Sequence, residues 1–190
     1  MTGTSGRSGA REEPLDLVGR AALGDREAFD RLVDLNLADL HRLALVVAGP
    51  DRADDVTQDA FVRAWQELPR LRDPERFVPW LRRILVNRAR DVQRAGRRQP
   101  RLIDLAAGAA TAEHRSGRVD PAAGVDGLVD LHRALADLSV DQRAVVGLHY
   151  LADLTLPEVA RTLGVPLGTA KSRLNAALVV LRRRLEVGAP

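Results

Sequence analysis

The chain has 190 residues, enough for one domain or two small ones. It is 45% hydrophobic but only 3% aromatic, so its core must consist mainly of leucine, valine and alanine, a composition that favours helices. The formal net charge is only +3, and every basic residue except Lys171 is arginine, the side chain best suited to bidentate contacts with phosphate and guanine.

The same composition excludes several classes of protein. Without cysteine the chain has no disulfide framework, no thiolate zinc site and no thiol switch of its own. It has no apolar run of membrane-spanning length and no apolar signal-peptide core, so we expect a cytoplasmic protein without direct membrane insertion. The histidines are scattered and no catalytic motif occurs, so we expect no enzyme, no metal and no cofactor.

Residues 1–14 are rich in glycine, serine and charge and predict a disordered tail, whereas residues 15–98 predict a helical domain. Asp25 precedes a first apolar run, Asp51 is expected to cap the next helix, and Asp73 with Pro74 begins a third. The first run places seven apolar residues inward: Phe29, Leu32, Val33, Leu37, Leu40, Ala44 and Val47.

Acidic and polar side chains gather near the start of the second helix, at Asp54, Asp55, Gln58 and Asp59. They could compensate the helix dipole, hold a divalent metal, or dock onto a basic protein surface. No histidine lies nearby in the sequence, and several carboxylates would share one helical turn. We favour a protein partner, because a DNA-binding chain would keep its acids away from the DNA.

The segment from Arg76 to Arg101 is strongly basic, with nine arginines and one acid, Asp91. A helix that is apolar on one side and this basic on the other indicates nucleic-acid binding, because merely solvated faces normally mix both signs. Within it, the amide of Asn87 suits a hydrogen bond to a base edge, whereas Trp80 is expected in the core.

Residues 99–126 are rich in alanine and glycine and predict a flexible linker, followed by a second helical domain over residues 127–190. A stripe of Leu128, Leu131, Leu135 and Leu138 begins this domain. Ser139 then has capping-box spacing with Gln142. The predicted fold class is all-α, with two small helical domains joined by a linker.

The stretch "PEVARTLGVPLGTAKSRL" predicts a helix-turn-helix. Thr155 and Glu158 have capping-box spacing, and Gly164 supplies the positive φ of a sharp turn. The second helix carries an apolar stripe that includes Ala170 and Leu174. Off the stripe, Thr169, Lys171, Ser172, Arg173 and Asn175 are expected to face outward, where such groups contact base edges and phosphates in a major groove.

Together these segments resemble the extracytoplasmic-function group of bacterial sigma factors, the two-domain group 4 of the sigma-70 family. "DRADDVTQDAFVRAW" resembles the family's segment 2.2, and "RFVPWLRRILVNRARDVQR" its segments 2.3 and 2.4. "LSVDQRAVVGLHYLADLTLPEVARTLGVPLGTAKSRLNAAL" resembles its region 4. The resemblance covers roughly residues 20–96 and 128–186. The chain departs from the family pattern at five positions: Val86, Arg90, Ala170, Asn175 and Ala176.

The resemblance implies a role for each surface. Its site residues fall into three groups: Asp55, Gln58 and Asp59 for core RNA polymerase; Asn87, Arg88 and Asp91 for the −10 element; and Thr169, Lys171, Ser172 and Arg173 for the −35 element. The expected partners are core polymerase, through its β′ and β subunits, promoter DNA, and an anti-sigma factor.

Two other functions remain open from the residues alone. A free-standing helix-turn-helix regulator that binds an operator would explain the second domain, but it gives no task to the acidic patch or the basic segment. A helical adaptor that binds only proteins would leave the outward cluster from Thr169 to Arg173 without a task.

Overall fold

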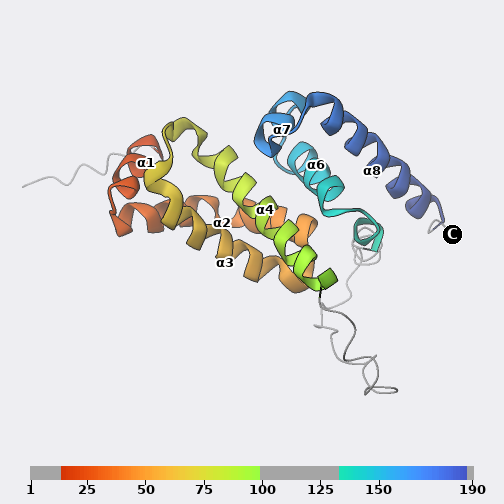
Figure 1. The fold of residues 1–190 in the computed structure, drawn as a ribbon, viewed down its shortest axis with the longest axis horizontal. Helices are drawn as coiled ribbons and strands as arrows, with labels where there is room; N and C mark the ends of the chain where they lie inside the picture. Colours follow the sequence, from red (N-terminus) through yellow and green to blue (C-terminus); the bar gives the residue numbers. More distant parts are fainter. Residues whose placement is uncertain (1–13, 99–132, 188–190) are drawn as a thin grey trace, which may run out of the picture.

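The computed structural model describes residues 14–98 and 133–187, and these are helical, with short turns between the helices. The first unit contains α1 (Pro14–Ala22), α2 (Arg26–Ala48), α3 (Pro50–Glu67), the 3-10 turns η1 (Leu68–Arg70) and η2 (Pro74–Arg76), and α4 (Phe77–Arg98). The second contains α6 (Val140–Tyr150), α7 (Leu156–Leu163) and α8 (Leu167–Val187). Figure 1 shows α1–α4 on one side of the molecule and α6–α8 on the other. The predicted all-helical fold with two helical units is confirmed.

The predicted caps of the first two apolar helices, at Asp25 and Asp51, have different outcomes in the structure. Asp25 caps α2 as expected, because its Oδ1 accepts a hydrogen bond from the backbone N–H of Ala28 at 3.1 Å. Asp51 does not cap α3: the helix begins one residue earlier, at Pro50, and Asp51 lies inside its first turn. Proline has its φ already set for a helix and lacks an N–H that would need a partner, so Pro50 begins the helix.

The start of α4 is built in two steps. Asp73 Oδ1 accepts the backbone N–H of Glu75 at 3.1 Å and so caps the short turn η2, which continues into α4 at Phe77. Trp80 is partly buried against the core, and its ring centroid lies 6.1 Å from that of Phe77. The predicted helix start and the core position of Trp80 are therefore confirmed.

The core of the first unit lies where α2, α3 and α4 meet. Helix α4 contributes the buried residues Phe77, Leu81, Ile84, Leu85, Val86 and Ala89. From α2, the expected inward residues are buried or partly buried except Leu37, which is 46% exposed. Leu37 instead lines an apolar groove between α2 and α3, whose lining residues all come from these two helices, so no third helix covers its side chain there.

The second unit contains the predicted helix-turn-helix. Gly164 ends α7 in the left-handed conformation with φ +66°, and the turn leads directly into α8. Small Ala160 and Ala170 are buried, which allows α7 and α8 to pack closely. Leu174 and Ala177 are also buried, so the apolar stripe of α8 faces the other helices of its unit as expected.

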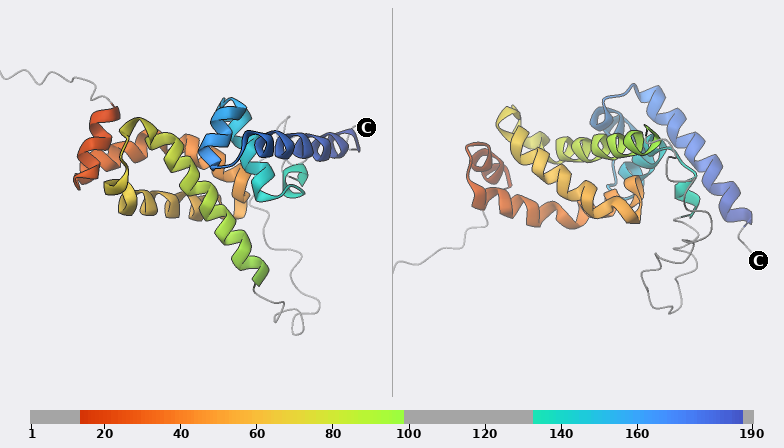
Figure 2. Two further views of the ribbon diagram at one scale, coloured as in Figure 1. Left: turned by 45° about the horizontal axis from the view of Figure 1, so that its top comes forward. Right: turned by 60° about the horizontal axis from the view of Figure 1, so that its bottom comes forward.

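The two units are packed against each other. Helix α6 contacts both α2 and α4, and α7 contacts α4. The further views in Figure 2 show the same arrangement, with α1 and the end of α8 at opposite ends of the molecule. The buried residues of both units form one continuous apolar cluster. Across the described residues, no helix has the length and apolar character needed to cross a membrane.

The remaining predictions fall largely outside the described residues. The linker over residues 99–126 and the leucines at 128 and 131 cannot be compared with the structure, whereas Leu135 and Leu138 are buried. The expected tail over residues 1–14 overlaps the structure at one residue, Pro14, which begins α1.

The start of α7 leads to a prediction about pH. Hydrogen bonds from the Thr155 side chain and backbone lower the pKa of Glu158 below its ordinary value of 4.5. A carboxylate with a lowered pKa in the folded state stabilises the protein fully above the ordinary value, and this stabilisation is lost as the pH falls through the lowered pKa. We expect Glu158→Ala to lower the free energy of unfolding at pH 7, and to lower it less as the pH falls below 4.5.

Urea unfolding monitored by far-UV circular dichroism at a series of pH values measures this difference. A difference between wild type and variant that stays constant across the acid range would show that the carboxylate does not stabilise the helix start through its charge.

The core of α4 leads to a second prediction. Leu85 of α4 is fully buried against the neighbouring helices. Leu85→Ala should therefore lower the free energy of unfolding by about 2–5 kcal/mol. Leu35→Ala, at an exposed leucine of α2, is the matched control and should change it by roughly 0.5 kcal/mol or less. Equal effects of the two substitutions in denaturant unfolding would contradict the packing described here.

Candidate nucleic-acid interface

Helix α4 separates its apolar residues from its arginines. Its apolar face is buried, and Arg83 and Arg94 on the opposite side are exposed. Arg82 is half-buried: burial lowers its pKa, and the carboxylate of Asp39 counteracts part of that shift. Because the ordinary pKa of arginine lies far above neutral pH, Arg82 stays charged at neutral pH despite this shift, and α4 presents positive charge along its exposed side.

The predicted −10 residues lie together on α4, each in contact with a charged neighbour. Asn87 is exposed, and its Oδ1 accepts a hydrogen bond from Arg90 Nη1 at 2.9 Å. Arg88 Nε donates to Asp59 Oδ2 at 2.6 Å. Asp91 accepts from Arg94 at 2.8 Å and lies 4.0 Å from Arg63 of α3. This part of α4 is thus a network of exchangeable ion pairs rather than an isolated cluster of cations.

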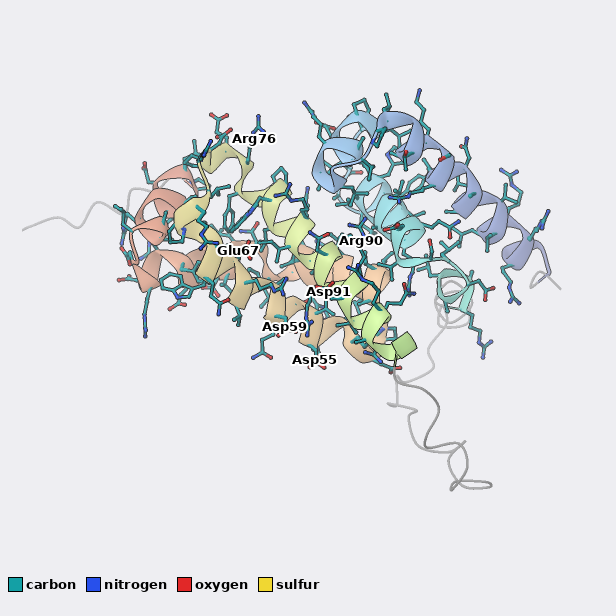
Figure 3. All side chains as sticks on the ribbon, viewed as in Figure 1. Asp55, Asp59, Glu67, Arg76, Arg90 and Asp91 are labelled. Carbon is teal, nitrogen blue, oxygen red and sulfur yellow. The ribbon has the colours of Figure 1, made fainter. Side chains whose placement is uncertain are left out.

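The predicted polymerase residues occupy one side of α3. Asp55, Gln58 and Asp59 are three and four residues apart, so they share a face of the helix, and the first two are exposed. Figure 3 shows Asp55 and Asp59 on α3 beside Asp91 of α4. The ion pair between Asp59 and Arg88 therefore joins two surfaces that the sequence analysis treated as separate.

The alternative of a metal site on α3 finds no support in its neighbours. Asp54 does bond with His41 Nε2 of α2 at 2.8 Å, a histidine 13 positions away in the sequence, but among the described residues this pair has no third side chain that could complete a metal site. Among the described residues, His, Asp and Glu side chains form no group of three or more that could hold a metal ion. The acids of α3 are instead spread along an exposed face, which suits a protein partner better than an ion.

An apolar groove borders this acidic face and was missed in the sequence analysis. It lies between α2 and α3, with Phe29, Val33, Leu37, Phe61, Val62 and Trp65 as its apolar lining and Asp54 and Gln58 at its edge. The side chains of Leu37 and Val62 are exposed in it. The 3.6-residue period of α2 could not reveal the groove, because period alone places Leu37 inward.

The predicted −35 residues of α8 divide into two sets. Lys171 and Ser172 are exposed, and Thr169 is half-buried, with its backbone oxygen accepting from Ser172 Oγ at 3.0 Å. Arg173 does not face outward as expected: its Nη2 lies 2.8 Å from Asp141 Oδ2 of α6. The reason is electrostatic, since the first turn of α6 places a carboxylate next to this side of α8.

Asp141 holds a second arginine from the other unit. Its Oδ1 accepts from Arg90 Nε of α4 at 2.7 Å, so one carboxylate binds one arginine of α4 and one of α8. Figure 3 shows Arg90 on the side of α4 nearer to α6. Sequence analysis missed Asp141 altogether, because no local pattern signals a pairing between residues 51 positions apart.

Comparison with known proteins adds independent information. Residues 32–99 match the family model "Sigma-70 region 2", and residues 128–181 match "Sigma-70, region 4". The chain is 35% identical over 180 residues to ECF RNA polymerase sigma factor SigM of Mycobacterium tuberculosis, covering 93% of this chain and 88% of that protein. It is 28% identical to the ECF RNA polymerase sigma-E factor of Escherichia coli, covering 90% and 93% of the two chains.

A further relative is longer. The chain is 33% identical to a probable RNA polymerase sigma factor, RfaY, of Xanthomonas campestris, but spans only 42% of that protein's length. The similarity to SigM, in contrast, covers 88% of that protein's length.

Two solved structures resemble the fold over most of both chains. CnrH in complex with the cytosolic domain of CnrY has a TM-score of 0.66 at 28% identity, covering 93% of this chain and 99% of CnrH. The sigma factor RpoE in complex with the anti-sigma factor NepR from Bartonella quintana has a TM-score of 0.65 at 26% identity, covering 85% and 98%.

The order of the charged faces and the helix-turn-helix along the chain agrees with the two family matches. An acidic face on α3, a basic face on α4 and a helix-turn-helix in α7–α8 fall within the two matched family regions. The chain therefore belongs to the extracytoplasmic-function group of the sigma-70 family and is an RNA polymerase sigma factor.

Proposed function

We propose that this sigma factor binds core RNA polymerase through α3 and directs promoter-specific initiation by reading the −10 element with α4 and the −35 element with α8. The observation that carries the proposal is the separation of charge on adjacent helices. An exposed acidic and polar face on α3 lies directly beside the exposed arginines of α4. These two surfaces suit different partners, a basic protein element and a nucleic acid.

Core polymerase binds the face formed by Asp55, Gln58 and Asp59. Two of these three side chains are exposed, and the third, Asp59, is shared with Arg88. A basic helical element of the β′ subunit provides the complementary charge, and the β subunit is the second contact expected of core. The groove lined by Leu37 and Val62 adds apolar area next to the charged face.

The −10 element binds along the exposed face of α4. Asn87 offers an amide for a base edge, and Arg88 and other arginines of α4 offer contacts to phosphates. Asp91 orients Arg94, which lies on the same exposed side. Unstacked bases are bound with about 1–3 kcal/mol each in single-strand binding proteins generally, so contacts of this kind can supply the free energy of opening without nucleotide hydrolysis.

The −35 element binds α8 as duplex DNA. Lys171 and Ser172 are exposed near the start of the helix, the part of a recognition helix that enters the major groove, and Thr169 precedes them. Arg173 joins them once a phosphate replaces Asp141 as its partner.

In this account the protein has no catalytic residue and needs no cofactor, and it acts in the cytoplasm, where polymerase and promoter DNA meet.

An anti-sigma factor is the expected regulator. Both solved structures of similar fold reported above are complexes: CnrH with the cytosolic domain of CnrY, and the sigma factor RpoE with the anti-sigma factor NepR. The apolar groove beside Gln58 is a surface that such a protein could cover, thereby blocking the polymerase face. Affinity purification from native cells tests this: repeated recovery of polymerase with no dedicated inhibitor would count against it.

The polymerase face leads to a direct prediction. Asp55→Arg should weaken binding of the full chain to purified core polymerase by tenfold or more, since it places a cation where a basic partner docks (tenfold is about 1.4 kcal/mol). Glu67→Arg is the matched control, because Glu67 is an exposed acid at the far end of the same helix (Figure 3). Equal affinities for core of wild type and Asp55→Arg, measured by fluorescence anisotropy, would remove α3 from the polymerase interface.

The two DNA surfaces should respond to different assays. Lys171→Ala should weaken binding of the holoenzyme to duplex promoter DNA by about 1–3 kcal/mol, whereas Asn87→Ala should leave closed-complex binding nearly unchanged and reduce strand opening. Arg183→Ala, at an exposed arginine later on α8, is the control. Gel-shift and permanganate-reactivity measurements separate the two steps. If Asn87→Ala impaired duplex binding as much as Lys171→Ala did, the division of labour between the helices would be wrong.

A further inference from the structure

We infer that the packed arrangement of the two units is a closed, inactive state of the free sigma factor, held by Asp141 and by close packing at Gly147. The inference rests on the proposed function of α4 and α8 in promoter recognition. It adds a regulatory element inside the chain itself, which acts before any other protein binds.

The polar part of the contact is a carboxylate with two arginines. Asp141 of α6 accepts from Arg90 of α4 through Oδ1 at 2.7 Å and lies 2.8 Å from Arg173 Nη2 through Oδ2. The side chains of Arg90, Arg173 and Asp141 are 23%, 26% and 35% exposed, so the cluster is shielded more than an ordinary surface ion pair. Breaking it therefore requires a competing anion or separation of the units.

The apolar part of the contact depends on a glycine. Gly147 lies in the middle of α6, where glycine is less favourable than any residue except proline. A Cβ at this position would lie 2.8 Å from Leu43 Cδ1 and 3.4 Å from Val46 Cγ1, both on α2 of the other unit. The glycine thus allows α6 to approach α2 closely, and a larger side chain would push the two units apart.

The closed state also contains a feature that favours opening. Arg143 of α6 lines a cavity between the units together with Arg52 of α3, and none of the described residues that line this cavity is acidic. Burial lowers the pKa of Arg143, and its Nε is buried without a hydrogen-bond partner among the residues that the structure describes. Separation of the units would return this guanidinium to water, which favours opening.

Geometry makes opening necessary for promoter recognition. Elements centred near −35 and −10 are separated by roughly 25 base pairs, or about 85 Å of B-form DNA at 3.4 Å per step. Helix α8 has 21 residues and is only about 30 Å long, and its unit contacts α4 directly. The closed chain cannot place α4 and α8 on both elements, whereas the 34 residues from 99 to 132 have a contour length of roughly 110 Å.

Opening would also release a DNA-facing residue. In the closed state α6 and α7 lie against α4, and Arg90, which also bonds Asn87, is paired with Asp141. Separation breaks the bond between the units and frees Arg90 for a phosphate, while Arg173 remains beside Asp141 in the second unit. Asp141 therefore competes with promoter DNA for Arg90, and the apparent affinity for the promoter falls with the fraction of closed molecules.

The absence of cysteine makes a direct test possible, because spin labels can be attached at two introduced cysteines. Leu23→Cys and Val179→Cys provide sites that are 91% and 47% exposed, one in each unit. Double electron–electron resonance should give one narrow distance distribution for the otherwise wild-type chain, because the two units are held in one arrangement. Asp141→Asn and, independently, Gly147→Leu should give broader distributions shifted to longer distances.

The matched control is Asp137→Asn, which makes the same change in charge. Asp137 pairs with Arg184 inside the second unit, so its loss should leave the distance distribution unchanged. In run-off transcription at limiting sigma factor, Asp141→Asn and Gly147→Leu should raise promoter-specific transcript about three- to tenfold, and the control should not.

The outcomes separate this inference from the proposed function. A wild-type chain that already shows long, broad distances, or variants with unchanged distances and unchanged transcript, would overturn the closed state. A chain that gave no promoter-specific transcript in any variant would instead overturn the proposed function, whatever the distances. Gly147→Leu keeps the test valid if Asp141→Asn weakens the first turn of α6, since it alters no charge.

Discussion

Helix α4 must bury one apolar face while it keeps a row of arginines in water, and the rest of the molecule depends on this division. Leu81, Leu85 and Ala89 anchor the helix on α2 and α3, where they are almost completely buried. The burial leaves the arginines on the side that faces away from the core. Helix α4 also contacts α6 and α7 of the second unit, and its Arg90 pairs with Asp141 of α6. One amphipathic helix thereby organises the core, the DNA surface and the contact between the units.

Carboxylates within the chain balance the charge of these arginines. Arg88 pairs with Asp59, Arg90 with Asp141, and Arg94 with Asp91. The pairs of Arg88 and Arg94 are more exposed than that of Arg90. Exposed pairs contribute only about 0–1 kcal/mol each, so a phosphate or a polymerase side chain can replace either partner of these two pairs at little cost. A formal net charge of only +3 is consistent with a protein that gains its strongest contacts by exchanging partners on assembly.

Local sequence patterns predicted the helices well. They did not predict side-chain positions that depend on contacts between residues far apart in the sequence. The cap at Asp25 and the turn at Gly164 depend on neighbouring residues, so short sequence motifs were sufficient to predict them. The outward direction of Arg173 was predicted wrongly, because it depends on where α6 places Asp141. The exposure of Leu37 was missed for the same reason, since only the packing of three helices decides which apolar residues are covered.

Run-off transcription with purified core polymerase on a library of genomic fragments tests the account most directly. Core alone is compared with core plus the full chain, and the 5′ ends of the transcripts are mapped. We predict new start sites that appear only with the protein and that share two upstream sequence blocks, near −10 and −35. A folded protein that neither binds core nor creates new start sites would contradict the account.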